Sequence, residues 1–213
     1  MGRMILSLTY FFMANKNNTI YPGKIYHVYN RAVEKRRIFY TEQDYNYFLQ
    51  KILFYKIITG VKLLCYSLIP NHHHFSLKEP TLRVGDPEGR YKRNVNCFKG
   101  SAIGKFMGLL ANSYTKYFNC KYDHSGRIFQ GPFQYKLVDN DAYLKKIIPY
   151  INLNPLKHNI VKNINDWPYT SHHEYVDQKK LRLIDEESLI DFDEYKEDLG
   201  FYIKELEDME YEF

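Results

Sequence analysis

Hydrophobic residues recur along the chain with two different periods, and each period predicts a type of element. Residues 24–31 alternate and are rich in β-forming side chains, which predicts a strand. Residues 41–44 resemble a capping box and open a helix, because the apolar positions after them recur at three and four up to Gly60. Short runs of β-forming residues predict two further strands, at residues 61–69 and 72–77.

The second half repeats this pattern after a long polar segment. Residues 79–96 carry glycine, proline and charge and predict a long basic loop. Apolar residues at helical spacing then predict a helix over about residues 98–118, followed by a strand at 132–138. Asn140 begins a third helix that runs towards Leu153. The order β-α-β-β-α-β plus a helix predicts an α+β, ferredoxin-like fold, with an antiparallel sheet and two helices on one face.

Charge is distributed unevenly along the chain. Residues 184–213 contain 13 acidic residues and two lysines, whereas the remaining residues carry a net charge of +16. The high positive charge of residues 1–183 implies a polyanionic partner, and nucleic acid is the first candidate. The acidic segment is either a solvated helix or disordered end, or a competitor of DNA for the basic face. We therefore divide the chain into an N-terminal extension (1–23), a basic domain (24–183) and an acidic C-terminal tail (184–213).

Composition says more about where the protein works in the cell than about the reaction that it performs. The chain has 213 residues, enough for one domain with an appendage. Its 21 tyrosines suit surfaces that stack bases, but an AT-rich genome explains their number equally well. Three cysteines without CxxC spacing predict reduced thiols and a cytoplasmic protein. No apolar run approaches the roughly 20 residues of a membrane helix, so no membrane partner is expected.

Three consecutive histidines give the strongest candidate for chemistry. Side chains alternate on a strand, so His72 and His74 emerge on one face and His73 on the other. Two imidazoles side by side on a rigid strand form a natural pair of ligands for a divalent metal ion. The alternative is a solvated polar strand end with adventitious metal affinity.

The third helix carries a second candidate. At about 100° per residue, Tyr143, Tyr150 and Asn154 lie along one edge of its apolar stripe. Tyr150 and Asn154 are one turn apart, about 6 Å along the axis. An amide oxygen there would complete a metal site, and the phenol would point at the group that is bound to the metal ion. Alternatively, Tyr150 is an ordinary boundary tyrosine and Asn154 simply ends the helix before Pro155.

Several of these segments resemble a known family. Pro70-Asn71-His72-His73-His74 resembles the His-hydrophobic-His motif of HUH endonucleases, although its middle residue is histidine. Residues 150–155 (YINLNP) resemble the nucleophile segment of insertion-sequence-200-like transposases, especially the REP-associated tyrosine transposases. The resemblance runs in order from about Tyr26 to Tyr175 and includes residues 114–119 (YTKYFN), 126–133 (GRIFQGPF) and 166–171 (DWPYTS).

This resemblance implies a metal-dependent tyrosine DNA transposase with the ferredoxin-like fold. By position, His72 and His74 would hold Mg²⁺ or Mn²⁺, Asn154 would be a third polar ligand, and Tyr150 would be the nucleophile. Its attack on single-stranded or hairpin DNA would give a 5′-phosphotyrosine and a free 3′-hydroxyl, which allows rejoining without ATP. The chain departs from the family in its acidic tail and in Pro149, which either aims or displaces Tyr150.

Candidate DNA-binding residues lie in four parts of the chain. Asn30 and Arg31 end the first strand, which neighbours the histidine strand in this fold. The charges of the long loop would contact phosphates, or would be an ordinary solvated surface. The other candidates, in the long loop, in the segment 127–130 and near the third helix, are Arg83, Arg90, Lys92, Arg93, Arg127, Phe129, Gln130, Lys136, Lys145 and Lys146.

Other functions remain as alternatives. A basic ferredoxin-like body with exposed tyrosines would also suit a non-catalytic protein that binds single-stranded nucleic acid by charge and stacking. A metal-dependent hydrolase would use water in place of Tyr150 as the nucleophile. The enzyme would be either mobile or a domesticated HUH nuclease, and either a monomer or a homodimer.

Overall fold

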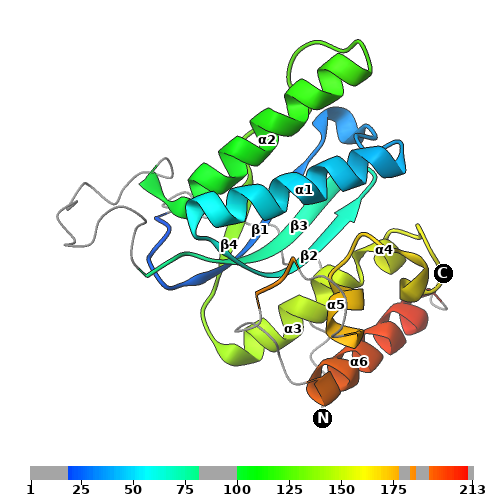
Figure 1. Ribbon diagram of the computed structural model, residues 1–213. Coiled ribbons are helices and arrows are strands. Elements are labelled where there is room, and N and C mark those ends of the chain that lie inside the picture. The colour runs from blue at the N-terminus through cyan, green and yellow to red at the C-terminus, as the bar shows by residue number, and fades with distance from the viewer. Residues whose placement is uncertain (1–18, 82–99, 178–182, 186–191, 211–213) are drawn as a thin grey trace.

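The computed structural model describes residues 19–81, 100–177, 183–185 and 192–210. Arg83, Arg90, Lys92 and Arg93 of the predicted basic loop lie outside these residues, as do the first 18 residues of the chain. The described elements follow the predicted order (Figure 1): β1 (Ile25–Arg31), η2 (Val33–Lys35), α1 (Glu42–Thr59), β2 (Lys62–Ile69), β3 (His72–Lys78), α2 (Ala102–Lys121), β4 (Gln134–Val138), α3 (Asp141–Asn152), α4 (Asn154–Lys157), η4 (Ile164–Asp166), α5 (His172–Val176) and α6 (Phe192–Glu210).

The four strands form one antiparallel sheet in the order β2-β3-β1-β4. This order places β1 and β3 side by side in the middle, with Tyr29 opposite His74 and Arg31 opposite His72. α1 and α2 cover one face of the sheet, and α3 lies on the opposite side with α4, α5 and α6 (Figure 1). The predicted α+β fold with its additional C-terminal helix is therefore confirmed.

The predicted helix starts are set by side-chain caps. At α1, the Asp44 carboxylate accepts hydrogen bonds from the backbone of Tyr40 and Thr41, as a capping box requires. Gly60 ends this helix with a φ of 71°, a conformation that glycine adopts without strain. At α3, the Asn140 side chain accepts from the Tyr143 amide at 2.8 Å.

Two elements begin later than their apolar pattern predicts. α2 starts at Ala102 because Ser101 caps it, accepting from the Gly104 amide at 2.8 Å. The buried Glu79 carboxylate accepts two further amide bonds at the same helix end. β4 starts at Gln134, since Pro132 has no N–H to donate to the strand ladder.

The C-terminal segment is tied to the sheet and to α3. Asp185 accepts from the Leu63 amide on β2 and donates its own amide to the Leu63 carbonyl. Tyr195 of α6 is fully buried, and its hydroxyl accepts from the Asn152 amide at the end of α3. The Asn152 oxygen in turn accepts from Ser171 at 2.7 Å. In the described parts of the chain, no helix is long and apolar enough to cross a membrane.

Candidate active site

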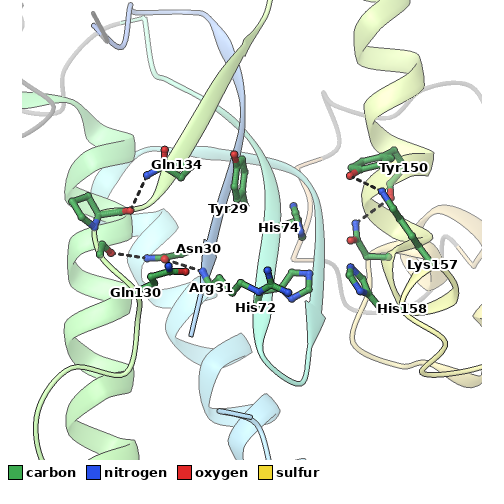
Figure 2. Close-up of a pocket in the computed structure, with 13 residues that line it drawn as sticks. Tyr29, Asn30, Arg31, His72, His74, Gln130, Gln134, Tyr150, Lys157 and His158 are labelled. Atoms are coloured by element: carbon green, nitrogen blue, oxygen red, sulfur yellow. Dashed lines mark hydrogen bonds between the residues drawn. The ribbon is translucent and has the colours of Figure 1, made fainter. Parts of the chain in front are cut away.

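A cavity of about 670 Å³ lies between the middle strands and the α3–α4 segment. Side chains from the sheet face side chains from α3 and α4 across it (Figure 2). Seven residues predicted from the sequence line it: Asn30, Arg31, His72, His74, Gln130, Tyr150 and Asn154. Its other lining residues are Tyr29, Gly131, Pro132, Gln134, Lys157 and His158.

His72 and His74 lie on the cavity face of β3, with ring centroids 5.1 Å apart. Asn71 fixes the protonation of His72, because its amide nitrogen donates to the Lys35 carbonyl and its oxygen must therefore face the ring. An amide oxygen only accepts, so the His72 Nδ1, 2.6 Å away, carries the proton and leaves Nε2 with a free lone pair. Burial, followed by His158 and Arg31, lowers the pKa of His72 to about 3.

His74 has a buried partner that sequence reasoning missed. The Nε2 atom of His27 on β1 lies 2.9 Å from the His74 Nδ1 atom, and the two rings stack. Burial, and then its neighbours His27 and His72, hold the pKa of His74 well below its usual value. Burial and Lys136 lower the pKa of His27 to about 3. These imidazoles are neutral near pH 7, the form that binds metal ions.

His73 points to the opposite face and lies in the hydrophobic core. It contacts the rings of Phe48, Phe75 and Phe129, and neither of its ring nitrogens has a hydrogen-bond partner among the residues that the structure describes. Burial lowers its pKa to about 3. The HUH motif has a hydrophobic residue at the position of His73, and in this protein hydrophobic side chains surround His73.

His73→Leu is expected to stabilise the protein by about 1–3 kcal/mol at pH 7, because it removes two unsatisfied buried polar atoms at similar side-chain volume. The folded pKa of about 3 lies below the usual 6.5, so His73 costs stability as the pH falls from 6.5 towards 3. The leucine variant should therefore gain more at pH 5 than at pH 7. Urea unfolding at both pH values measures this, and an unchanged or lower midpoint would contradict it.

Tyr150 projects from α3 into the cavity. α3 continues unbroken past Pro149, so this proline does not remove Tyr150 from the site. The Tyr150 hydroxyl accepts a hydrogen bond of 3.1 Å from the Lys157 Nζ atom, which also lies 4.6 Å from the centre of the tyrosine ring. The ring of His27 meets the ring of Tyr150 edge-on at 6.2 Å. The phenol and the histidine pair are thus on the same side of the sheet.

Asn154 is buried at the start of α4, directly beside Tyr150. Its amide nitrogen donates to the carbonyls of Tyr150 and Ile151, at 3.1 and 3.2 Å, and so caps the end of α3. With the nitrogen committed to these carbonyls, the amide oxygen is the atom that a cation would contact.

The cavity is electropositive. Arg31 from β1 and Lys157 from α4 line it, and none of its thirteen described lining residues is acidic. The Arg31 Nε atom is buried without a hydrogen-bond partner in the described structure. A buried donor without a partner favours a bound acceptor such as a phosphate oxygen.

Five predicted DNA-binding residues do not line this cavity. Arg127 is exposed, and Phe129 is buried in the core beside Tyr114, so its ring is not presented at the surface. Lys136 of β4 lies over the Tyr143 ring, 5.0 Å from its centre. The remaining two lie on α3 and are Lys145 and Lys146.

The types of donor atom that line the cavity, imidazole nitrogen and amide oxygen, suit a divalent metal ion. No group of three histidine, cysteine, aspartate or glutamate side chains converges on one point in the described structure. The candidate ligands are the two imidazoles of His72 and His74 and the amide oxygen of Asn154. Such a set leaves positions for water or phosphate oxygens, as Mg²⁺ sites in nucleotide enzymes commonly do.

Two known proteins that are similar to this chain are REP-associated tyrosine transposases. No protein-family model matches the chain. A curated protein of Haemophilus influenzae named as a REP-associated tyrosine transposase is 43% identical over 53 residues, which are 25% of this chain and 30% of that protein. A solved structure of a REP-associated tyrosine transposase bound to a REP hairpin has a TM-score of 0.57 at 18% identity, over 81% of this chain and 90% of the other.

The chain resembles REP-associated tyrosine transposases. The resemblance predicted from the sequence is thus confirmed, locally in sequence and over most of the chain in fold. The sequence match spans less than a third of the Haemophilus protein. The hairpin belongs to the solved relative, and what this transposase-like chain does with DNA follows as a proposal.

Proposed function

We propose that this transposase-like chain cleaves and rejoins single-stranded DNA through a covalent bond to Tyr150, with Mg²⁺ or Mn²⁺ as cofactor. One observation carries the proposal: a single cavity combines a tyrosine hydroxyl, two neutral imidazoles and two cationic side chains. A protein that only binds nucleic acid needs charge and stacking, but has no use for a paired set of metal ligands beside a phenol.

The substrate class follows from the charge of the cavity. A phosphodiester carries a negative charge, and Arg31 and Lys157 attract it from opposite sides of the cavity (Figure 2). The guanidinium group of Arg31, which lines the cavity, has several N–H donors for a phosphate oxygen. Hairpin-flanked single strands are the proposed substrate, as in the solved relative that holds a REP hairpin.

The proposed reaction exchanges one phosphate ester for another. The Tyr150 oxygen attacks the phosphorus, the bond to the 3′ oxygen breaks, and that oxygen leaves with its electron pair to become a 3′-hydroxyl. A divalent ion held by His72, His74 and the Asn154 oxygen would neutralise phosphate charge and stabilise the leaving oxygen. The resulting 5′-phosphotyrosine retains the energy of the ester, so the 3′-hydroxyl of a second strand can displace Tyr150 without ATP.

The test uses hairpin DNA labelled on either side of the cleaved phosphate, the full-length chain and Mn²⁺. Hairpins formed by inverted repeats, if such repeats flank the gene, are the first substrates to try. The 5′-phosphorylated part should become attached to the protein, and the other part should be released with a free 3′-hydroxyl. Trypsin should place the adduct on residues 147–157, a peptide whose only tyrosine is Tyr150.

Two other outcomes contradict the proposal and point to the alternatives. Free cleaved DNA without a protein adduct indicates that water attacks, as in a metal-dependent hydrolase. Tight binding without cleavage in the presence of Mn²⁺ indicates a non-catalytic DNA-binding protein. Adding a second labelled end then tests rejoining, which a simple nuclease does not perform.

A further inference from the structure

The Tyr150 hydroxyl is in contact with a cation that no sequence motif pointed to. The Lys157 Nζ atom donates to this oxygen at 3.1 Å and lies 4.6 Å from the ring centre. We propose that Lys157 is a catalytic residue: its ammonium group stabilises the negative charge that develops on the Tyr150 oxygen when the phenol loses its proton. This inference rests on the function proposed above.

The path of the chain brings this lysine back to the tyrosine. Seven residues separate the two, and between them the chain passes from α3 into the single turn of α4. The turn is held by hydrogen bonds from the Lys157 amide to Leu153 and from the His158 amide to Asn154. Lys157 is therefore placed by backbone bonds, and its long side chain reaches across to the phenol (Figure 2).

Other charged groups are less suited to this role. Arg31 lies on the sheet side of the cavity, whereas Lys157 lies on the same side as Tyr150 (Figure 2). Burial, and then Lys157, lower the pKa of the neighbouring His158, so that ring is neutral near pH 7. Among the described residues, no carboxylate forms an ion pair with Lys157 that would compete for its ammonium group.

The ammonium group of Lys157 acts in both cleavage and rejoining of the DNA. In cleavage, the phenol gives up a proton as its oxygen bonds to phosphorus, and the departing 3′ oxygen takes up a proton, with water carrying it between them. In rejoining, the phenolate is the leaving group. The neighbouring ammonium group stabilises this phenolate each time, because a charge-assisted hydrogen bond is stronger than a neutral one.

The experiment compares Lys157→Met, Lys157→Arg and the exposed control Lys162→Met in single-turnover adduct formation on labelled hairpin DNA with Mn²⁺. Methionine keeps the stem and removes the charge. We expect the rate at saturating DNA to fall about 10- to 100-fold in Lys157→Met. Lys157→Arg should retain most of the rate, and Lys162→Met all of it. Circular dichroism melting confirms that each variant is folded.

The outcomes separate this inference from the proposed function. If Lys157→Met weakens DNA binding but leaves the rate at saturation unchanged, Lys157 only binds phosphate and the inference is overturned while the proposed function stands. An arginine variant as slow as the methionine variant also overturns it, because the charge is then not what matters. If the wild-type chain forms no adduct, both ideas are overturned.

Discussion

Tyr150→Phe should reduce covalent attachment of DNA by at least about 10³-fold, since the change removes the oxygen on which the adduct is proposed to form. The change removes one oxygen atom. The ring keeps its place on α3 and its contact with the Lys157 ammonium group, so folding and DNA affinity should stay close to those of the wild type. The measurement is adduct formation on labelled hairpin DNA, alongside the dissociation constant for the same DNA.

Tyr29→Phe provides the matched control. Tyr29 is the other tyrosine of the cavity, and its ring stacks on His74 at 5.4 Å. Burial raises the pKa of the Tyr29 hydroxyl, which makes its phenolate harder to form. Tyr29→Phe should therefore keep adduct formation within about tenfold of the wild type. The opposite ranking of the two variants would assign the nucleophile to Tyr29 and refute the role proposed for Tyr150.

His72→Ala and His74→Ala should each weaken Mn²⁺ binding by at least about 100-fold, since even the loss of a partner behind a ligand costs 10- to 100-fold. Cleavage should be lost at Mn²⁺ concentrations that saturate the wild type. Titration calorimetry measures the affinity without DNA, and adding excess Mn²⁺ tests for partial rescue of cleavage.

His73→Leu is the control within the same three residues. It lies on the other face of β3 and contacts the core, so it should bind Mn²⁺ as the wild type does. Equal loss of Mn²⁺ affinity in all three variants would show that the tract binds metal without regard to strand geometry. That result would contradict the proposal that His72 and His74 are a pair of metal ligands.

Local patterns were sufficient to predict the elements of this fold. Capping residues such as Thr41 and Asn140 set helix starts, and the strict alternation along β1 and β3 fixed which side chains share a face. The late start of α2 was missed because the prediction followed the apolar period alone, although Ser101 is a local cap signal. The second support of this helix end is Glu79, a residue distant in the chain whose carboxylate accepts from two amides there. Such a contact leaves no trace in the hydrophobic period.

The candidate site was predictable only where its residues share one element. His72 and His74 follow from strand geometry alone. His27 shares a face with Tyr29 and Arg31 by the same alternation, so this signal was present, but its contact with His74 depends on the pairing of β1 with β3. Lys157 and His158 lie in and after a single helical turn without periodicity, and only the path of the chain brings them to Tyr150.

The tie between α6 and the end of α3 makes α6 part of the scaffold of the candidate site. A protein shortened at residue 183 loses Tyr195, whose ring is buried and whose hydroxyl is hydrogen-bonded to Asn152 and His172, so both partners become open to water. Each hydrogen bond replaced by water costs about 0.5–1.5 kcal/mol. Because Asn152 is only two residues from Tyr150, this cost falls on α3, the helix that carries Tyr150, far in sequence from the part removed.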